Sequence, residues 1–417
     1  MPRPRRSIFA LIAPGLLIAA TGVGAGDLAT AGFSGMKLGV GVAWAIVLGA
    51  LMKLLLTEGL TRWQLATGTT VIEGAAHRIG RWTLIVFLAY FLVWSFFTAR
   101  ALMNAAGVAG HALLPVLADP ASGKIMHAIA HGLIALAIVR LASFKRFEQL
   151  MGVTIALMFV TVVTTAVLMR PDWGALARGL LVPTIPAGEP QGVSWTIALI
   201  GGVGGTVTIL CYAYWVREQG RETTDDLTAC RIDLSVAYAL TALFGVAMLV
   251  IASGVDENAK GASLIVRLAE RIEPQTGAFG RWIFLIGAWA AIFSSVLGVW
   301  QAVPYLFADL WRVLLKRDEA ATGVSTSSRP FRLSQLALVL VPMSGLFGTF
   351  ENAQRHYTVV GALFLPLLAL ALLRLNTVRA WMGRHANRPW TTLALIATAL
   401  FFLWIFALKL SPWLGAG

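Results

Sequence analysis

Gly22-Val23-Gly24-Ala25-Gly26-Asp27 and Gly201-Gly202-Val203-Gly204-Gly205 interrupt two long apolar segments of the chain. Inside a bilayer, every backbone N–H and C=O that leaves a helix needs another partner, so interruptions of this kind seldom occur without a role. Interruptions at corresponding places in two halves of a chain are typical of transporters whose substrate site lies at broken helices. We therefore expect both segments to be membrane helices that unwind at these glycines.

The composition predicts a polytopic membrane protein. Of the 417 residues, 58% are hydrophobic and 13% are charged, whereas a soluble protein carries about 25% charged residues. The two cysteines, Cys211 and Cys230, are too few for a disulfide framework. The sequence has no phosphate-binding loop, nucleophile triad or redox motif, so we predict neither an enzyme nor a cofactor.

Apolar segments long enough to cross a bilayer recur along the whole chain. Eleven of them lie near 8–34, 39–60, 82–104, 123–142, 149–169, 193–216, 232–254, 280–309, 333–349, 356–373 and 391–410. With the N-terminus in the cytoplasm, the loops on that side hold 21 of the 33 Lys and Arg residues, as the positive-inside rule requires. The net charge of +13 then reflects orientation and predicts no nucleic-acid partner.

These segments predict a multi-pass protein of the bacterial inner membrane, with a cytoplasmic N-terminus and an external C-terminus. Arginines followed by an apolar run also resemble a signal peptide, but this run continues past any cleavage site. Each glycine interruption opens a set of five helices, and an odd number inverts the topology of the second set. We expect one transmembrane domain over 1–417, with repeats near 8–170 and 193–373 and an extra helix near 391–410.

Four stretches, taken in order, resemble one transporter family. They are Ala13-Pro14-Gly15, Glu58-Gly-Leu-Thr-Arg62-Trp-Gln-Leu-Ala-Thr-Gly68, Phe144-Lys-Arg-Phe-Glu148-Gln-Leu150 and Thr358-Val-Val-Gly-Ala-Leu-Phe-Leu365-Pro366. Over nearly its whole length the chain resembles the Nramp metal-ion transporters, which have the LeuT-like architecture. The resemblance implies an all-α fold with a five-plus-five inverted repeat, broken first and sixth helices, and secondary transport of a divalent metal.

The chain departs from the family's pattern at the metal site. The family's Asp-Pro-Gly-Asn is replaced by Gly24-Ala25-Gly26-Asp27, so the leading carboxylate is missing and another stands at the place of the asparagine. The family's Met-Pro-His aligns with Thr208-Ile209-Leu210, and its tenth-helix glutamine with Thr358. Three acidic positions of the family's third helix align with Tyr90, Phe97 and Arg100. Metal selectivity and proton coupling therefore do not carry over from the resemblance alone.

Asp27 is the only carboxylate that this division places deep inside an apolar segment. An acid at membrane depth is a functional candidate, and the plainer alternative is an N-cap of the half-helix that follows. A cation would be held by Asp27, backbone carbonyls near Gly24 and Gly205, and the hydroxyls of Thr208 and Thr358. These are hard oxygen ligands, and losing the thioether moves the expected preference from manganese or iron toward magnesium.

Three further residues are candidates for gating or coupling. Arg100 lies near the outer end of the third segment, where it either reaches the interface or faces the transport path. On the path it would pair with Asp27, repel a metal cation or bind an anionic group. Glu58 and Arg62 lie at the cytoplasmic end of the second segment and form either a gate or a structural ion pair.

The leading hypothesis is a secondary active transporter that moves a divalent metal cation, Mg²⁺ or Mn²⁺-like, by alternating access. Asp27 is its main ligand and Thr208 a second one. The alternative keeps the fold but carries a small organic solute, such as an amino acid or amine, without metal transport. Missing metal ligands and Arg100 favour that alternative, and a non-transporting receptor is a third possibility. Expected partners are the transported ion or solute and membrane lipid; the sequence leaves direction and oligomeric state open.

Overall fold

The computed structural model describes residues 8–186, 192–255, 264–315 and 324–410, and within these ranges it holds helices and loops but no β-strand. Eight helical stretches are long and apolar enough to cross a membrane, and two shorter apolar helices, Leu11–Gly22 and Pro389–Trp404, accompany them. The expectation of an all-α membrane protein is therefore confirmed. The count of eleven crossings stays a prediction, because helix length alone does not show where a bilayer begins and ends.

The first half of the chain opens with a helix that is broken at the expected glycines. Its elements are α1 (Ile8–Gly22), α2 (Ala25–Leu38), a 3₁₀ turn η1 (Gly39–Val42), α3 (Ala43–Thr67), α4 (Val71–Arg78), α5 (Trp82–Leu113), α6 (Pro120–Leu141), α7 (Phe144–Leu168) and α8 (Trp173–Leu181).

The second half opens in the same way. Its elements are α9 (Gly192–Gly202), η2 (Val207–Cys211), α10 (Tyr212–Glu218), η3 (Thr224–Asp226), α11 (Leu227–Ala252), α12 (Leu264–Leu314), α13 (Arg329–Leu340), η4 (Val341–Gly345), α14 (Phe350–Ala362), α15 (Phe364–Thr377), α16 (Arg379–Met382), η5 (Gly383–His385) and α17 (Pro389–Leu410). Gly277, with φ 71° and ψ −177°, divides α12 into two helices.

Short sequence signals set the connection between α3 and α4. Gly68 takes a left-handed conformation with φ 73°, and its N–H returns to the Gln64 carbonyl, which ends α3. Thr70 and Glu73 then cap α4 reciprocally, since each side chain accepts the other residue's backbone N–H. The turn therefore holds Glu73 in one place at the end of α3.

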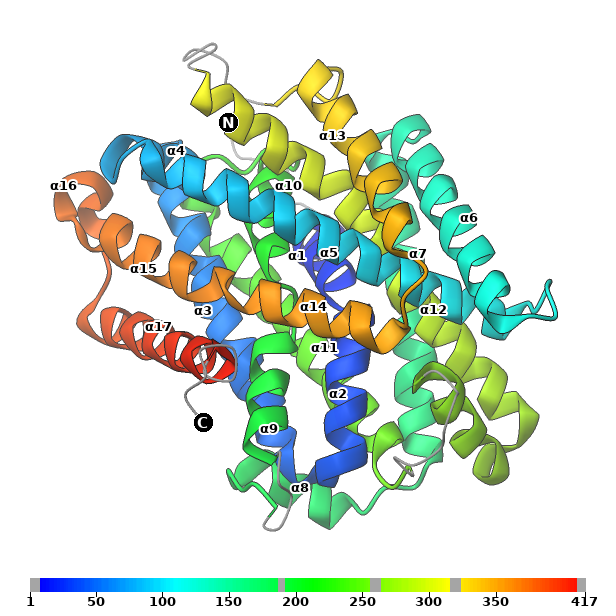
Figure 1. Ribbon diagram of the computed structural model, residues 1–417. Coiled ribbons are helices and arrows are strands. Elements are labelled where there is room, and N and C mark those ends of the chain that lie inside the picture. Colours follow the sequence, from blue (N-terminus) through cyan, green and yellow to red (C-terminus); the bar gives the residue numbers. More distant parts are fainter. Residues whose placement is uncertain (1–7, 187–191, 256–263, 316–323, 411–417) are drawn as a thin grey trace.

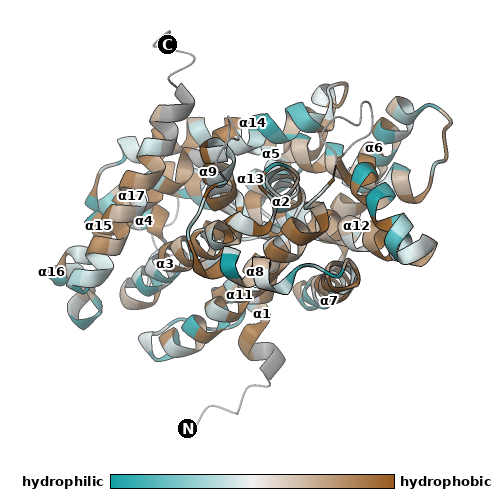
Figure 2. Cartoon of the chain, turned by 90° about the horizontal axis from the view of Figure 1, so that it is seen from below, coloured by the Kyte–Doolittle hydropathy of each residue, from teal (hydrophilic) through white to brown (hydrophobic). Residues whose placement is uncertain are grey.

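The broken helices lie in the middle of the molecule, with α11 beside both α1 and α2 (Figure 1). The helices α4, α10 and α16 lie at one end, and α8 lies at the other. The view in Figure 2 shows hydrophobic residues covering peripheral helices such as α7 and α17. Val160 of α7 and Leu393 of α17 are 66% and 68% exposed, which suits a surface covered by lipid.

Candidate functional site

The two breaks meet at the centre of the molecule. Helix α1 ends at Gly22 and α2 begins at Ala25, while α9 ends at Gly202 and η2 begins at Val207. Gly204 and Gly205 have φ angles of 80° and 77°, which other residues rarely adopt. A Cβ atom on Gly22 would lie only 3.0 Å from the Gly204 carbonyl carbon, so the two backbones touch there. Both expected interruptions are confirmed, and close backbone approach explains their glycines.

Asp27 links the first break to the second. It is the third residue of α2, only 1% exposed, and its Oδ1 accepts the backbone N–H of Gly204 at 2.8 Å. The N-cap position of α2 belongs to Gly24, so Asp27 is not the N-cap. The carboxylate lies near the N-terminal end of α2, where the helix dipole favours negative charge.

Lys53 is a buried cation at the same place, and the sequence did not predict its contacts with the second break. It lies within α3, is 0% exposed, and its Nζ donates to the carbonyls of Gly201, at 3.0 Å, and Val203. The Val203 C=O and the Gly204 N–H belong to one peptide group. Lys53 and Asp27 therefore hold opposite edges of the same peptide unit, close enough to interact electrostatically.

Serine side chains of α12 donate hydrogen bonds to backbone carbonyls at the first break. The hydroxyls of Ser294 and Ser295 donate to the Ala20 carbonyl at 3.0 and 3.2 Å, and Ser295 also lies 3.2 Å from the Val23 carbonyl. A Cβ atom on Gly24 would lie 2.0 Å from Ser295 Oγ, so the glycine makes room for this contact. The first break is therefore anchored to α12.

An aromatic wall covers the other side of the breaks. The Trp94 indole of α5 donates to Thr206 Oγ1 in the second break at 3.0 Å. Tyr357 of α14 packs on the first break, since a Cβ atom on Gly26 would lie 2.7 Å from its ring. Tyr90, which stands where the family has an acid, donates to the Val360 carbonyl at 3.0 Å. Aromatic side chains therefore line this side of the breaks, in keeping with the sequence, which has no acid at the Tyr90 position.

The two expected threonine ligands differ in their surroundings. Thr208 is buried in η2, directly after the second break, and its Oγ1 lies 2.5 Å from where a Cβ of Gly205 would be. The Thr358 hydroxyl donates to the Gln354 carbonyl within α14 at 2.8 Å. In the described parts of the chain, no group of three or more His, Cys, Asp and Glu residues is arranged to hold a metal. Any metal here would depend on Asp27 and neutral oxygens.

The candidate gating residues lie away from the breaks. Glu58 accepts from Arg62 of its own helix at 3.2 Å and from Arg231 of α11 at 2.7 Å. Arg62 also donates to the His385 carbonyl at 2.9 Å, so this pair joins α3, α11 and η5. The Arg100 Nε donates to the Gly345 carbonyl at 2.8 Å and thereby ties α5 to η4.

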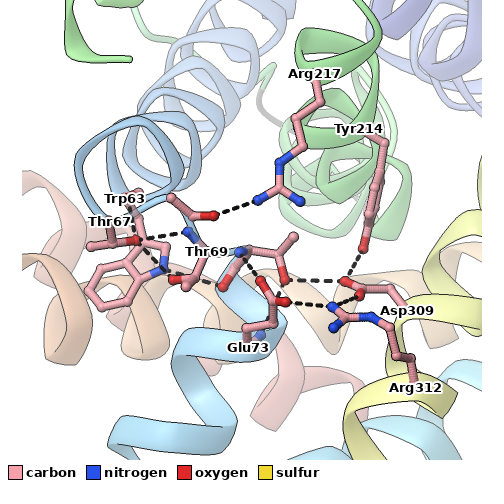
Figure 3. Close-up of polar contacts among 10 residues, drawn as sticks. Trp63, Thr67, Thr69, Glu73, Tyr214, Arg217, Asp309 and Arg312 are labelled. Atoms are coloured by element: carbon pink, nitrogen blue, oxygen red, sulfur yellow. Dashed lines mark hydrogen bonds and ion pairs between the residues drawn. The ribbon is translucent and has the colours of Figure 1, made fainter. Parts of the chain in front are cut away.

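A second polar cluster joins α4, α10 and α12 at the end of the molecule where α4 and α10 lie (Figure 3). Arg312 forms ion pairs with Glu73 and Asp309, and the Tyr214 hydroxyl donates to Asp309 at 2.8 Å. Burial alone raises the pKa of Glu73, but hydrogen bonds from Arg312 and the Thr70 N–H outweigh it and leave the pKa below its usual value. The ion pairs therefore join α4 to α12, and α10, the second half of a broken helix, is attached through the Tyr214 hydroxyl.

Asp233 of α11 and Arg221 form a latch on α1. Both are 0% exposed and lie 3.2 Å apart. Asp233 Oδ1 accepts the Gly15 N–H at 2.8 Å, and Arg221 donates to the Leu11 carbonyl, so the latch contacts an N–H and a C=O that stand four residues apart in α1. Asp233 is a second buried carboxylate, and the sequence did not single it out because it stands at the edge of the apolar segment 232–254.

The opposite end of the molecule contains a cavity of about 740 Å³ between α2, α5, α6, α12 and α14. Its lining includes Phe33 from the far end of α2 and Glu351 from the start of α14. Lys124, Arg267 and Arg281 also line it, so most of its charged side chains are basic, although the lining as a whole is largely apolar.

Comparison with known proteins agrees with this arrangement. Residues 15–410 match the family model described as natural resistance-associated macrophage protein-like, or Nramp. The divalent metal cation transporter MntH of Acidiphilium cryptum is 26% identical over 401 residues, which cover 91% of this chain and 84% of that protein. MntH of Pectobacterium carotovorum is 23% identical over 371 residues, covering 83% of this chain and 88% of the relative.

Solved structures show the same fold at lower identity. The crystal structure of a manganese transporter from Eremococcus coleocola superposes with a TM-score of 0.79 at 16% identity, covering 99% of this chain and 90% of the other. MHP1, a nucleobase-cation-symport-1 family transporter, gives a TM-score of 0.58 at 12% identity. The family match over nearly the whole chain and the paired breaks lead to one conclusion: the chain belongs to the Nramp family.

Proposed function

We propose that this protein is a secondary transporter that moves a divalent metal cation, Mg²⁺ or Mn²⁺-like, across the bacterial inner membrane. Its family is one of membrane transporters rather than enzymes, and the relatives named above are divalent metal cation transporters. The observation that carries the proposal is the position of Asp27, a buried carboxylate where both broken helices meet. An acid in that position is a candidate to bind a transported cation.

The cation would bind mainly through oxygen. Asp27 supplies the negative charge, the carbonyls around Gly24 and Gly205 supply neutral oxygens, and the Thr208 and Thr358 hydroxyls complete the candidate set. Carboxylate, carbonyl and hydroxyl oxygens suit magnesium and manganese better than softer metals. Because only one of these ligands is charged, the ion would keep part of its water shell, as magnesium commonly does.

The polar contacts support an alternating-access cycle. At the end that holds α4 and α10, α1 is latched by Asp233 and Arg221, and Tyr214 of α10 bonds to Asp309, which Arg312 links to Glu73 of α4. The cavity of about 740 Å³ lies at the other end. We propose that the latched end faces the cytoplasm, as the distribution of Lys and Arg predicts, and that it is closed in this state. Opening of this end would then require breaking these ion pairs as the two repeats, 8–170 and 193–373, move relative to each other.

Lys53 is the observation that favours the alternative, a carrier of a small organic solute. Its ammonium offsets the charge of Asp27, so the buried centre of the site has no net negative charge to attract a dication. A neutral or zwitterionic solute carries no net charge, so its binding does not depend on a net negative charge in the site. The aromatic wall of Trp94 and Tyr357 would pack against the apolar part of such a solute.

Flux measurements separate the two functions. Purified wild-type protein in proteoliposomes is tested for Mg²⁺, Mn²⁺ and Ca²⁺ uptake, and in parallel for counterflow of a panel of labelled amino acids and amines. Metal uptake above that of empty liposomes supports metal transport. Solute counterflow without any metal uptake, in protein that remains monodisperse, would replace it with the alternative.

A further inference from the structure

We propose that Lys53 determines the substrate specificity of the site: its ammonium is a built-in cation that occupies carbonyl oxygens of the second break and weakens the binding of free divalent metals. This inference rests on the proposed transport site at the two breaks.

The ammonium of Lys53 is confined to the interior. Lys53 stands ten residues after Ala43 and fourteen before Thr67, so it lies about 15 Å or more along α3 from either end at 1.5 Å per residue. A lysine side chain cannot span that distance to reach the interface. The side chain is 0% exposed, so its charge must be satisfied within the protein.

Lys53 is satisfied by the atoms that an inorganic cation would use. Its Nζ donates to the carbonyls of Gly201 and Val203, at the C-terminal end of α9. Carbonyls at the end of a helix lack partners in the helix and carry the negative end of its dipole. Unwound carbonyls and the C-terminal ends of half-helices are where broken-helix transporters coordinate cations. The ammonium therefore takes the place of a bound ion.

Asp27 is the neighbour that offsets this positive charge, while Thr57 and Tyr238 nearby are neutral. Thr57 lies one turn along α3 and exchanges a hydrogen bond with the Tyr238 hydroxyl of α11 at 2.6 Å, and both groups are neutral. Asp27, across the peptide group of Val203 and Gly204, is the acid that interacts with Lys53. With Lys53 charged, a dication at Asp27 enters a centre whose net charge is zero. Without Lys53, it meets one negative charge and two released carbonyls.

The test measures equilibrium binding of ⁵⁴Mn²⁺ to the purified full-length protein. We expect Lys53→Met and Lys53→Gln to bind Mn²⁺ roughly tenfold more tightly or better than the wild type, because a buried positive charge near the ion is gone. Lys53→Gln retains an N–H donor for the carbonyls, so it preserves the break if Lys53→Met does not fold. Lys53→Arg retains the charge and should bind as weakly as the wild type. Lys145→Met removes an exposed lysine of α7 and is the matched control.

The outcomes distinguish this inference from the proposed function. Tighter binding by both neutral variants, with Lys53→Arg and Lys145→Met unchanged, supports it even if the wild type moves no metal in liposomes. Unchanged or weaker Mn²⁺ binding by a folded neutral variant overturns it, even if the wild type does transport metal. Metal flux by the wild type tests the proposed function by itself, so the two failures cannot be confused.

Discussion

Removing the charge of Asp233 should open the end of the molecule that the latch closes. In the closed state, Asp233→Asn removes the carboxylate charge that lies 3.2 Å from the buried Arg221 guanidinium. Breaking one member of a buried ion pair typically costs about 3–5 kcal/mol. Once α1 moves away, Arg221 reaches water and that cost disappears. The substitution therefore shifts the equilibrium toward the open form by about 3 kcal/mol, which is roughly a hundredfold in population.

Cys230 provides a native reporter of this opening. Its Sγ lies 3.9 Å from Arg221 Nη1, and the thiol is buried. In a Cys211→Ser background, we expect Asp233→Asn to raise the rate of Cys230 alkylation by a hydrophilic maleimide about a hundredfold. Asp119→Asn, at the exposed N-cap of α6, is the control and should leave the rate unchanged. An Asp233→Asn rate within twofold of the wild type, in a protein with normal gel-filtration behaviour, would refute the latch.

Two further predictions concern stability. Gly22→Ala should lower the melting temperature by an amount corresponding to about 1–3 kcal/mol, because its Cβ would lie 3.0 Å from the Gly204 carbonyl carbon. Gly41→Ala is its control, since nothing lies within 4 Å of a Cβ there, and equal melting temperatures would show that the breaks do not touch. The lowered pKa of Glu73 means that its charged form stabilises the fold above about pH 4.5, and that this contribution is lost as the pH falls through its folded pKa. Glu73→Gln should therefore have a lower melting temperature than the wild type at neutral pH, and its melting temperature should fall less as the pH is lowered. Melting temperatures of the two proteins that fall in parallel with pH would contradict the ion pair with Arg312.

The sequence predicted the parts of the fold that local patterns encode. Glycine density located both breaks, apolar length located the helices, and the order of short motifs indicated the family. Asp27 was a recognisable candidate because a carboxylate within an apolar segment is costly and therefore conspicuous. The N-cap alternative was wrong because the half-helix begins at Ala25 and has Gly24 as its N-cap, three residues before Asp27.

The contacts that decide the site's charge were beyond the sequence. Lys53 meets its carbonyl partners across 148 and 150 residues, and Asp233 meets Gly15 across 218. A lysine within an apolar segment indicates a buried functional group. Its partners, however, are backbone carbonyls, which every residue has, so the sequence does not indicate which ones it contacts. Arg100 shows the same limit: its contact is the Gly345 carbonyl, so its side-chain charge did not indicate its partner.

The most direct test of the account compares metal uptake by wild-type and Asp27→Asn protein in matched proteoliposomes, with Asp119→Asn as control. Asparagine is nearly isosteric and can still accept the Gly204 N–H, but it carries no charge. We predict that Asp27→Asn folds, keeps its melting temperature within a few degrees and loses metal uptake, while Asp119→Asn transports normally. Undiminished uptake by folded Asp27→Asn would contradict the claim that the carboxylate at the meeting point of the two breaks binds the transported cation.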